Sequence, residues 1–210
     1  MFTTYAHADE DHFCPSGDLG DGTAPTTRIS TWRAGNVTAG SSPKLRLEFD
    51  GDSSVCGDTP CFARGGSTGV EVRRAGSSVC VGVPQKGKLA TMFGWIPASR
   101  WHAGDGSPQP VARWIGVWQN ATAKITVRRS GDDRLDIEGH AIRALDADGG
   151  HDIYGDFAIS GKLENGTLTG GDGSCQVSVR LVGDYLAMAD NDAGGGMGVS
   201  FFGIYRLRHH

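Results

Sequence analysis

The sequence of 210 residues lacks the features that define several protein classes. Its apolar runs are a few residues long, far short of the roughly 20 that a membrane-spanning helix needs, so we expect a soluble protein. Basic residues number 20 against 24 acidic ones, for a formal net charge of −4, and no basic stripe occurs, which argues against nucleic-acid binding. No window shows a convincing helical period of apolar residues. These absences favour a soluble, helix-poor protein.

Glycine, in contrast, is abundant, with 33 of the 210 positions, more than double the roughly 7% that is usual. The glycines follow no collagen period, and hydrophobic residues make up 38% of the chain, which also argues against disorder. Glycines scattered between short apolar stretches are typical of turns that join short strands.

The chain divides near its middle at residues 105–110, a polar segment that contains glycine and two prolines. We therefore expect an N-terminal segment with a small β-barrel over residues 1–104, a linker at 105–110, and an antiparallel β-barrel over residues 111–210. In the last part, apolar and polar residues alternate through about seven or eight strands, and Asn165-Gly166 is a strong two-residue hairpin signal. The expected fold class is all-β, with the second barrel closed in up-and-down order.

The five cysteines favour disulfides in an oxidising compartment, because none forms a C-x-x-C pair and no histidine lies at zinc-finger spacing. Cys56 and Cys61 bracket a turn-forming sequence whose ends could meet, and Cys14 would then pair with Cys80. Four cysteines allow three pairings, so this connectivity is one hypothesis among three. Cys175 is left over. We expect a periplasmic or extracellular location.

Two segments resemble known families. Val79–Val83, a hairpin, and Gly94-Trp95-Ile96-Pro97 look like the end of bacterial Src-homology-three-like domains, a resemblance that covers about 60 residues. The second half resembles a group of exported proteins of Gram-negative bacteria whose C-terminal domain opens with W-x-G-x-W and ends with D-N-x-x-C-G-G-x-N-V-x-F-x-G-x-Y-R. Here the first motif is Trp114–Trp118 and the second spans Asp190–Arg206. The resemblance implies an exported, two-part β protein.

The chain departs from this family at two positions, because Gly194 replaces the motif's cysteine and Gly198 its asparagine. If the family cysteine pairs with the one that matches Cys175, this chain has lost the partner. The resemblance therefore implies that Cys175 is a free thiol, buried and unreactive.

Trp118 in a first strand and Arg206 in a last strand are also similar to lipocalin-like barrels, in which an arginine stacks over a tryptophan and closes one end. The alternative is that Trp118 is an ordinary core residue and Arg206 is exposed. Either way, the two residues are expected to be structural.

Tryptophans supply the first binding hypothesis. Four of the five, Trp95, Trp101, Trp114 and Trp118, lie within 24 residues around the linker. Ligands often bind at domain junctions, and tryptophans stack on sugars or anchor partner proteins, so Trp95, Trp101 and Trp114 are candidate binding residues. The alternative is that the rings only pack the two domains together.

A glycine-rich loop supplies the second hypothesis. Asp190, Asn191, Asp192 and Met197 belong to a segment with three consecutive glycines just before a strand. Such a segment is either a tight approach of backbone or a rim loop that projects toward a partner. These four residues are therefore candidates for binding.

Acidic residues suggest two further possibilities. The loop Asp146–Asp156 offers four carboxylates to calcium, but its spacing does not fit an EF-hand, so a solvated connection is the preferred interpretation and no metal site or cofactor is expected. Asp184, Asp190 and Asp192 could form a paired-carboxylate hydrolase site, which requires a defined separation between two carboxyl groups.

Three functions follow from these features. The preferred one is a non-enzymatic periplasmic or secreted binding protein, a monomer that docks peptidoglycan or an envelope protein. The alternative is an inhibitor or immunity protein that blocks a cell-wall hydrolase or toxin. The third is a hydrolase that uses loop carboxylates.

Overall fold

The computed structural model describes residues 14, 31–38, 44–46, 62–143, 152–172, 175–191 and 199–208. The proposed Cys56–Cys61 pair, Asp192, Met197 and most of the acidic loop lie outside these residues. Among the described residues, no helix is long and apolar enough to cross a membrane.

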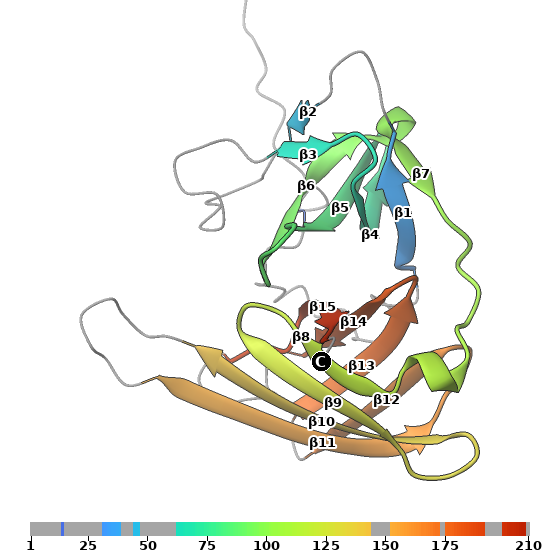
Figure 1. Cartoon of the computed structure of the whole chain (residues 1–210), viewed down its shortest axis with the longest axis vertical. Helices are drawn as coiled ribbons and strands as arrows, with labels where there is room; N and C mark the ends of the chain where they lie inside the picture. The colour runs from blue at the N-terminus through green and yellow to red at the C-terminus, as the bar shows by residue number, and fades with distance from the viewer. Residues whose placement is uncertain are drawn as a thin grey trace, which may run out of the picture.

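The structure is all-β, as the sequence predicts, and contains a small five-stranded sheet and a larger eight-stranded one (Figure 1). The small sheet has the order β6-β5-β4-β1-β7, and all its pairings are antiparallel. Its strands are β1 (Arg33–Val37), β4 (Thr68–Ala75), β5 (Ser78–Pro84), β6 (Thr91–Pro97) and β7 (Trp101–Ala103). The pair β2 (Lys44–Arg46) and β3 (Phe62–Arg64) lies beside it, and the 3₁₀ turn η2 (Ala98–Arg100) joins β6 to β7.

The eight-stranded sheet is a nearly closed antiparallel barrel with the order β11-β10-β9-β8-β15-β14-β13-β12. A 3₁₀ turn, η3 (Val111–Arg113), precedes it. Its strands are β8 (Gly116–Gln119), β9 (Ala123–Arg129), β10 (Arg134–Arg143), β11 (Ile153–Lys162), β12 (Thr167–Asp172), β13 (Cys175–Val182), β14 (Tyr185–Asp190) and β15 (Gly203–Leu207). Each strand pairs with its neighbour in sequence, and β15 also returns to pair with β8. The exception is β11 with β12: these two strands lie beside each other, with Gly170 against Ile159, but among the described residues their β-pairing is limited to the isolated bridge Glu164–Thr167. This is the up-and-down order that the sequence predicts.

Two local signals account for this order. The turn between β11 and β12 is Asn165-Gly166, and both residues have positive φ, 51° and 76°, as a type I′ hairpin turn requires. Along β10 the burial alternates, with Leu135 and Ile137 inside and their neighbours facing outward. At Gly139 the inward position has no side chain, because the ring of Phe157 on β11 fills the space where a Cβ would stand.

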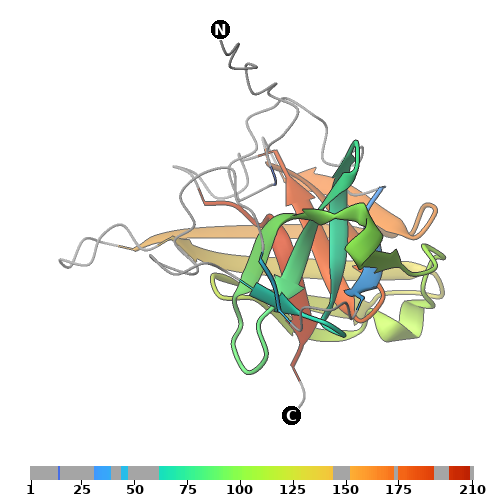
Figure 2. The same cartoon turned by 90° about the horizontal axis from the view of Figure 1, so that it is seen from above.

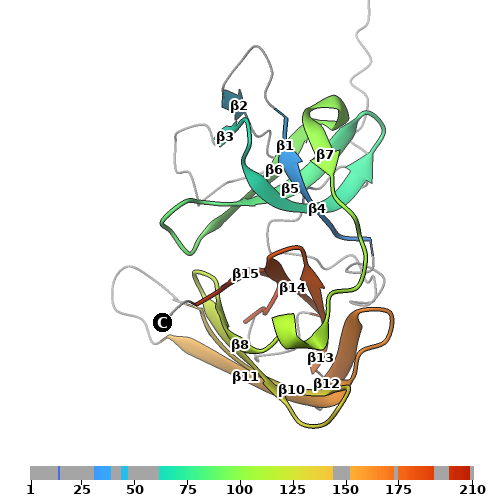
Figure 3. The ribbon, with the colours of Figure 1, turned by 45° about the vertical axis from the view of Figure 1, so that its right-hand side comes forward.

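The small sheet and the barrel share a hydrophobic core. The sheet contributes Trp32, Val70, Val72, Cys80 and Trp95, and the outer face of the barrel contributes Val182, Ala187, Ala189, Phe202 and Ile204. Figures 1 and 3 show the small sheet lying across β14 and β15. The contact is close, because a Cβ at Gly82 would stand 2.4 Å from Ile204 Cδ1. The two parts therefore pack as one body through buried apolar side chains.

The segment that joins the two parts, residues 104–110, also contacts both of them. The Gly106 carbonyl accepts a 2.8 Å hydrogen bond from the Arg180 guanidinium on the barrel, and the Gly104 amide donates to Ala34 on the small sheet. The Gly166 turn lies against Pro108. Although its composition is typical of a flexible linker, the segment is held along its length by packing and hydrogen bonds.

Candidate functional site

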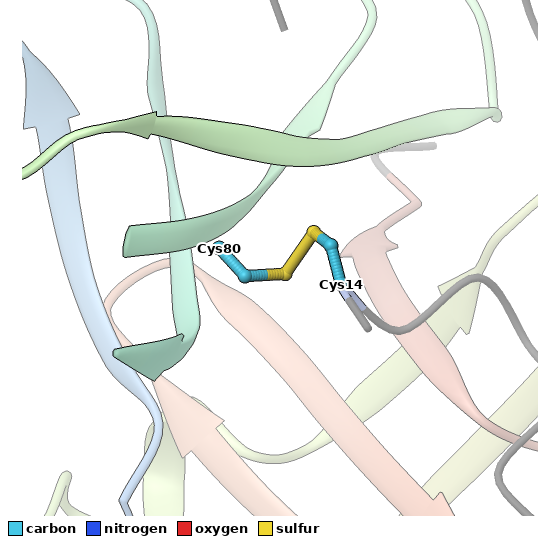
Figure 4. The surroundings of a disulfide bond; sticks show 2 residues. All are labelled: Cys14 and Cys80. Atoms are coloured by element: carbon cyan, nitrogen blue, oxygen red, sulfur yellow. A yellow bond between two sulfur atoms is a disulfide. The ribbon is translucent and has the colours of Figure 1, made fainter. Parts of the chain in front are cut away.

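Cys14 and Cys80 form a disulfide, and Cys80 belongs to the core shared by the two parts (Figure 4). The bond closes a separation of 66 residues and ties the N-terminal segment to β5. The predicted Cys14–Cys80 bond is thus present in the structure, whereas the Cys56–Cys61 pair lies outside the described residues. Cys175 is buried among the apolar side chains of the barrel interior and carries a thiol.

The four tryptophans around the linker do not gather at one site. Trp95 lies in the core shared by the two parts, Trp101 in the separate core of the small sheet, and Trp114 and Trp118 inside the barrel. None of these side chains is more than 8% exposed. The four rings therefore form no common binding surface, because they come from different segments of the chain and each is buried in the core that its own segment faces.

Trp118 and Arg206 do not stack. On β15, Tyr205 and Leu207 face the barrel interior, where Trp118 lies, whereas Ile204 and Arg206 face outward because of the two-residue period. The Arg206 guanidinium donates to the Gln85 carbonyl at the end of the β5–β6 hairpin. Arg206 is thus structural in a different way from the lipocalin-like pattern, since it links the barrel to the small sheet.

Asp190 connects the two ends of the glycine-rich segment, whereas Asn191 attaches the start of that segment to β13. Asp190 is fully buried, and its carboxylate accepts hydrogen bonds from the Ser200 hydroxyl (3.0 Å) and the Phe201 amide. The Asn191 side-chain carbonyl accepts a 3.0 Å bond from the Gln176 amide. These two candidates for binding therefore have structural roles in the described residues.

The Tyr205 side chain lies in the barrel interior near Asp190. It is fully buried, and its hydroxyl donates a 2.7 Å hydrogen bond to the Phe201 carbonyl. Burial, and secondarily the negative charge of Asp190, raise the pKa of Tyr205 far above its usual value. Tyr205 is therefore an uncharged hydrogen-bond donor.

Of the three carboxylates proposed for a hydrolase, Asp184 and Asp190 do not form a pair, and Asp192 lies outside the described residues. Asp184 lies in the β13–β14 turn, where its side chain is 86% exposed and forms an ion pair with Arg113. Asp190 lies at the other end of β14, six residues away, which is about 20 Å along a strand. Paired glycosidase carboxyls lie about 5–9.5 Å apart, so these two residues cannot work together in that way.

Of the acidic loop, only its last part is described. The Asp156 carboxylate is hydrogen-bonded to the ring of His140, directly across from it on β10. Among the described residues, no group of three or more His, Cys, Asp and Glu side chains is arranged to hold a metal ion.

The last residues of β10 and the first residues of β11 carry an exposed apolar pair that belongs to none of the sequence motifs above. Ile142 is 46% exposed and Tyr154 is 64% exposed, and the strand register places them directly opposite each other. We call this pair the hairpin patch. In Figures 1 and 2 this end of β10 and β11 extends past the neighbouring strands. Both residues occupy outward positions of the alternation, and a large apolar residue at such positions is a signal that the sequence carries.

No protein-family model, curated protein or solved structure matches the chain. The family resemblances therefore stay predictions, and the function has to be argued from the structure.

Proposed function

We propose that the chain is an exported, non-enzymatic binding protein that docks a protein of the cell envelope through the hairpin patch. The observation that carries this proposal is the exposed cross-strand pair Ile142 and Tyr154. Tyrosine is among the residue types that contribute most to binding energy at protein interfaces. Two large apolar side chains exposed side by side are unfavourable in water, and a bound partner would remove them from it.

The surroundings of the patch have the polar rim of an interface. Two residues further along each strand, His140 and Asp156 are hydrogen-bonded to each other, and the exposed Arg143 follows Ile142 at the end of β10. The Ile142 amide donates a hydrogen bond to the Thr122 carbonyl, just before β9 begins at Ala123. Beyond this contact, β10 extends past the start of β9. The patch therefore stands at a protruding end of the sheet, where a partner can approach from more than one side.

The chemistry of the patch supports a protein partner over a glycan. An aromatic ring can stack on a sugar, but the aliphatic side chain of Ile142 beside Tyr154 suits the apolar core of a protein interface.

Export is supported by the disulfide between Cys14 and Cys80, because such bonds persist mainly in oxidising compartments. The same protruding patch suits the inhibitor function. Two protruding strand ends with exposed apolar side chains are a suitable shape for blocking the cleft of an enzyme, and a cell-wall hydrolase would then be the envelope protein that is bound.

The test compares capture of envelope proteins by the wild-type chain and by the double variant Ile142→Ser, Tyr154→Ser. Both positions face outward, so the variant should melt within a few degrees of the wild type. Loss of two interface side chains should weaken capture by about tenfold or more. Leu89→Ser is the matched control, because Leu89 is 47% exposed but lies in the β5–β6 connection.

Two parallel assays separate the alternatives. If the wild-type chain inhibits a purified cell-wall hydrolase and the double variant does not, the docked protein is an enzyme and the chain is its inhibitor. If the chain sediments with purified peptidoglycan through Tyr154 and captures no protein, the ligand is a glycan and the proposal of a protein partner is wrong. Equal capture by all three chains would also refute a role for the patch.

A further inference from the structure

The turn between β5 and β6, residues 85–90, is short and positively charged. A 3.0 Å backbone hydrogen bond joins its first and last residues, and Gly87 adopts a φ of 75°, in the left-handed region that glycine accepts without strain. Lys86 and Lys88 flank this glycine, and both are exposed. We call residues 85–90 the basic turn.

In the described part of the chain, the two lysines of the basic turn form no ion pair. Their ammonium groups are compact, strongly hydrated charges on flexible stems. Both charges are therefore available to a negatively charged partner.

The end of β15 places two arginines beside the basic turn. The Arg206 guanidinium donates to the Gln85 carbonyl, so its charge lies at the base of the turn. Arg208 is exposed, and its amide donates a 2.8 Å hydrogen bond to the Val117 carbonyl, which keeps the chain along the barrel wall. Figures 1 and 3 show the end of β15 close to the β5–β6 turn. The small sheet and the barrel thus both contribute to one positively charged end.

Four positive side chains gather at this end of the molecule: Lys86, Lys88, Arg206 and Arg208. One carboxylate lies near them in the strand register, since Asp184 precedes Tyr185, the partner of Arg206. That carboxylate forms an ion pair with Arg113, so these two charges offset each other. The whole chain carries a formal net charge of −4, and this end is therefore a local region of the opposite sign.

Such a distribution of charge favours a flat, negatively charged partner. A negative surface attracts the positive end and repels the rest of the chain, so it selects one orientation of the molecule. Lys86 and Lys88 are exposed on a turn, where a flat surface can approach both of them at once. A small ligand, in contrast, binds in a concave site that surrounds it.

We propose that the basic turn and the end of β15 bind the headgroups of an anionic phospholipid bilayer, so that the chain attaches to the membrane surface without entering it. A lysine or arginine held near such a surface strengthens binding by about fivefold. This site is separate from the hairpin patch and goes beyond the protein-docking function proposed above, so the two proposals stand or fall independently.

The test measures sedimentation of the full chain with two kinds of vesicle. Vesicles of phosphatidylcholine alone carry no net charge, and vesicles of equal parts phosphatidylcholine and phosphatidylglycerol are negative. We expect the wild-type chain to bind the negative vesicles only. Binding should weaken as salt is added, because the screening length falls from about 10 Å at 0.1 M to about 3 Å at 1 M.

The double variant Lys86→Gln, Lys88→Gln should bind the negative vesicles about 10- to 30-fold more weakly than the wild type. The matched control is Arg134→Gln, Lys162→Gln, which changes the net charge by the same amount at two exposed residues that face each other across β10 and β11. This control should bind as the wild type does. The melting temperature of each variant shows whether it is folded.

Two single variants complete the test. Arg208→Gln removes one charge outside the basic turn, so it should weaken binding by about fivefold even if the lysine variant folds poorly. Leu89→Ser changes the basic turn without changing its charge, so it should keep most of the binding.

The proposal is overturned if the wild-type chain binds neither kind of vesicle or binds both equally. It is also overturned if the Arg134, Lys162 variant or Leu89→Ser loses as much binding as the lysine variant, because the local charge would then not be the cause. The double variant Ile142→Ser, Tyr154→Ser should bind the negative vesicles as the wild type does.

Discussion

Substitution of Phe202 by alanine tests whether the small sheet and the barrel unfold as one body. Phe202 is 9% exposed and belongs to the core that the two parts share. Its ring contacts Trp32 edge-on, with the centroids 5.5 Å apart, and Phe93 at 5.7 Å. Both partners come from the small sheet, whereas Phe202 directly precedes β15 of the barrel.

The expected loss of stability is about 3 kcal/mol. Core Phe→Ala changes cost about 3–5 kcal/mol, and this range includes the lost transfer free energy and the cavity that remains. The lower end applies because Phe202 keeps some solvent exposure and lies where two sheets can move together to fill a cavity. For a chain of this size, each kcal/mol lowers the melting temperature by about 2–4 °C, so the expected decrease is about 6–12 °C.

Hydrogen exchange locates the effect. The reporters are the backbone amides of Val81 in β5 and Ile137 in β10, because both residues are fully buried in strands that pair on both sides. If the two parts unfold together, Phe202→Ala lowers the protection of both amides by the same free energy. Phe157→Ala is the control, since Phe157 is 4% exposed and lies inside the barrel, in a core to which the small sheet does not contribute.

The control variant also provides the result that would refute the reasoning. With a single cooperative unit, Phe157→Ala weakens protection at Val81 as much as at Ile137, although Val81 lies in the other part. If Val81 keeps its protection while Ile137 loses it, the shared core does not couple the two parts. Two separate thermal transitions in the wild-type chain would lead to the same conclusion.

Three further predictions concern single contacts. Asp190→Ala should lower the free energy of unfolding by about 2–3 kcal/mol in urea titrations, because it leaves a buried amide without its charged acceptor; a change below about 0.5 kcal/mol would contradict the structural role of this carboxylate. Ser160→Ala should raise the pKa of Asp136 toward 3.8 in an NMR titration, since the Ser160 hydrogen bond is the main cause of its lowered value. A lowered carboxyl pKa stabilises the fold above the unfolded-state pKa, and this stability is lost as pH falls through the folded-state pKa; an unchanged pKa would show that the hydrogen bond is absent in solution. Cys14→Ser should cost about 4 kcal/mol, because the bond to Cys80 closes 66 residues; the wild-type chain in reductant should then melt where the variant does, and equal melting with and without reductant would contradict the disulfide.

The barrel could be predicted well from the sequence because its strands have one covered face and one exposed face. In β10 and β11 the apolar residues stand at every second position, and the burial follows them through Leu135, Ile137, Phe157 and Ile159. The hairpin signal at Asn165-Gly166 specifies its turn through local backbone conformation alone. Both signals depend on the local sequence alone, so they predict these strands and this turn without knowledge of the rest of the fold.

The shared core was harder to predict, because burial of an outward face depends on which part of the chain covers it. In β14, Leu186 and Met188 face the barrel interior, while Ala187 and Ala189 face the small sheet, and all four are fully buried. The sequence does carry a sign of this, since β14 has almost no polar residue before Asp190. Strands that are buried on both faces have continuous apolar runs instead of alternation.

The candidate binding residues were the least predictable, and the reason is geometric. Closeness along the chain suggests that tryptophans around the linker meet, but each ring is buried in the core that its own segment faces. The feature that carries the proposed function arises where the regular alternation of paired strands ends. The hairpin patch lies where β10 passes the end of its neighbour β9. A bulge or a strand overhang depends on the register between strands, which a period of apolar residues within one strand does not specify. Sites in such β proteins are therefore best sought first at register shifts and strand ends, and only then among the residue types that usually bind ligands.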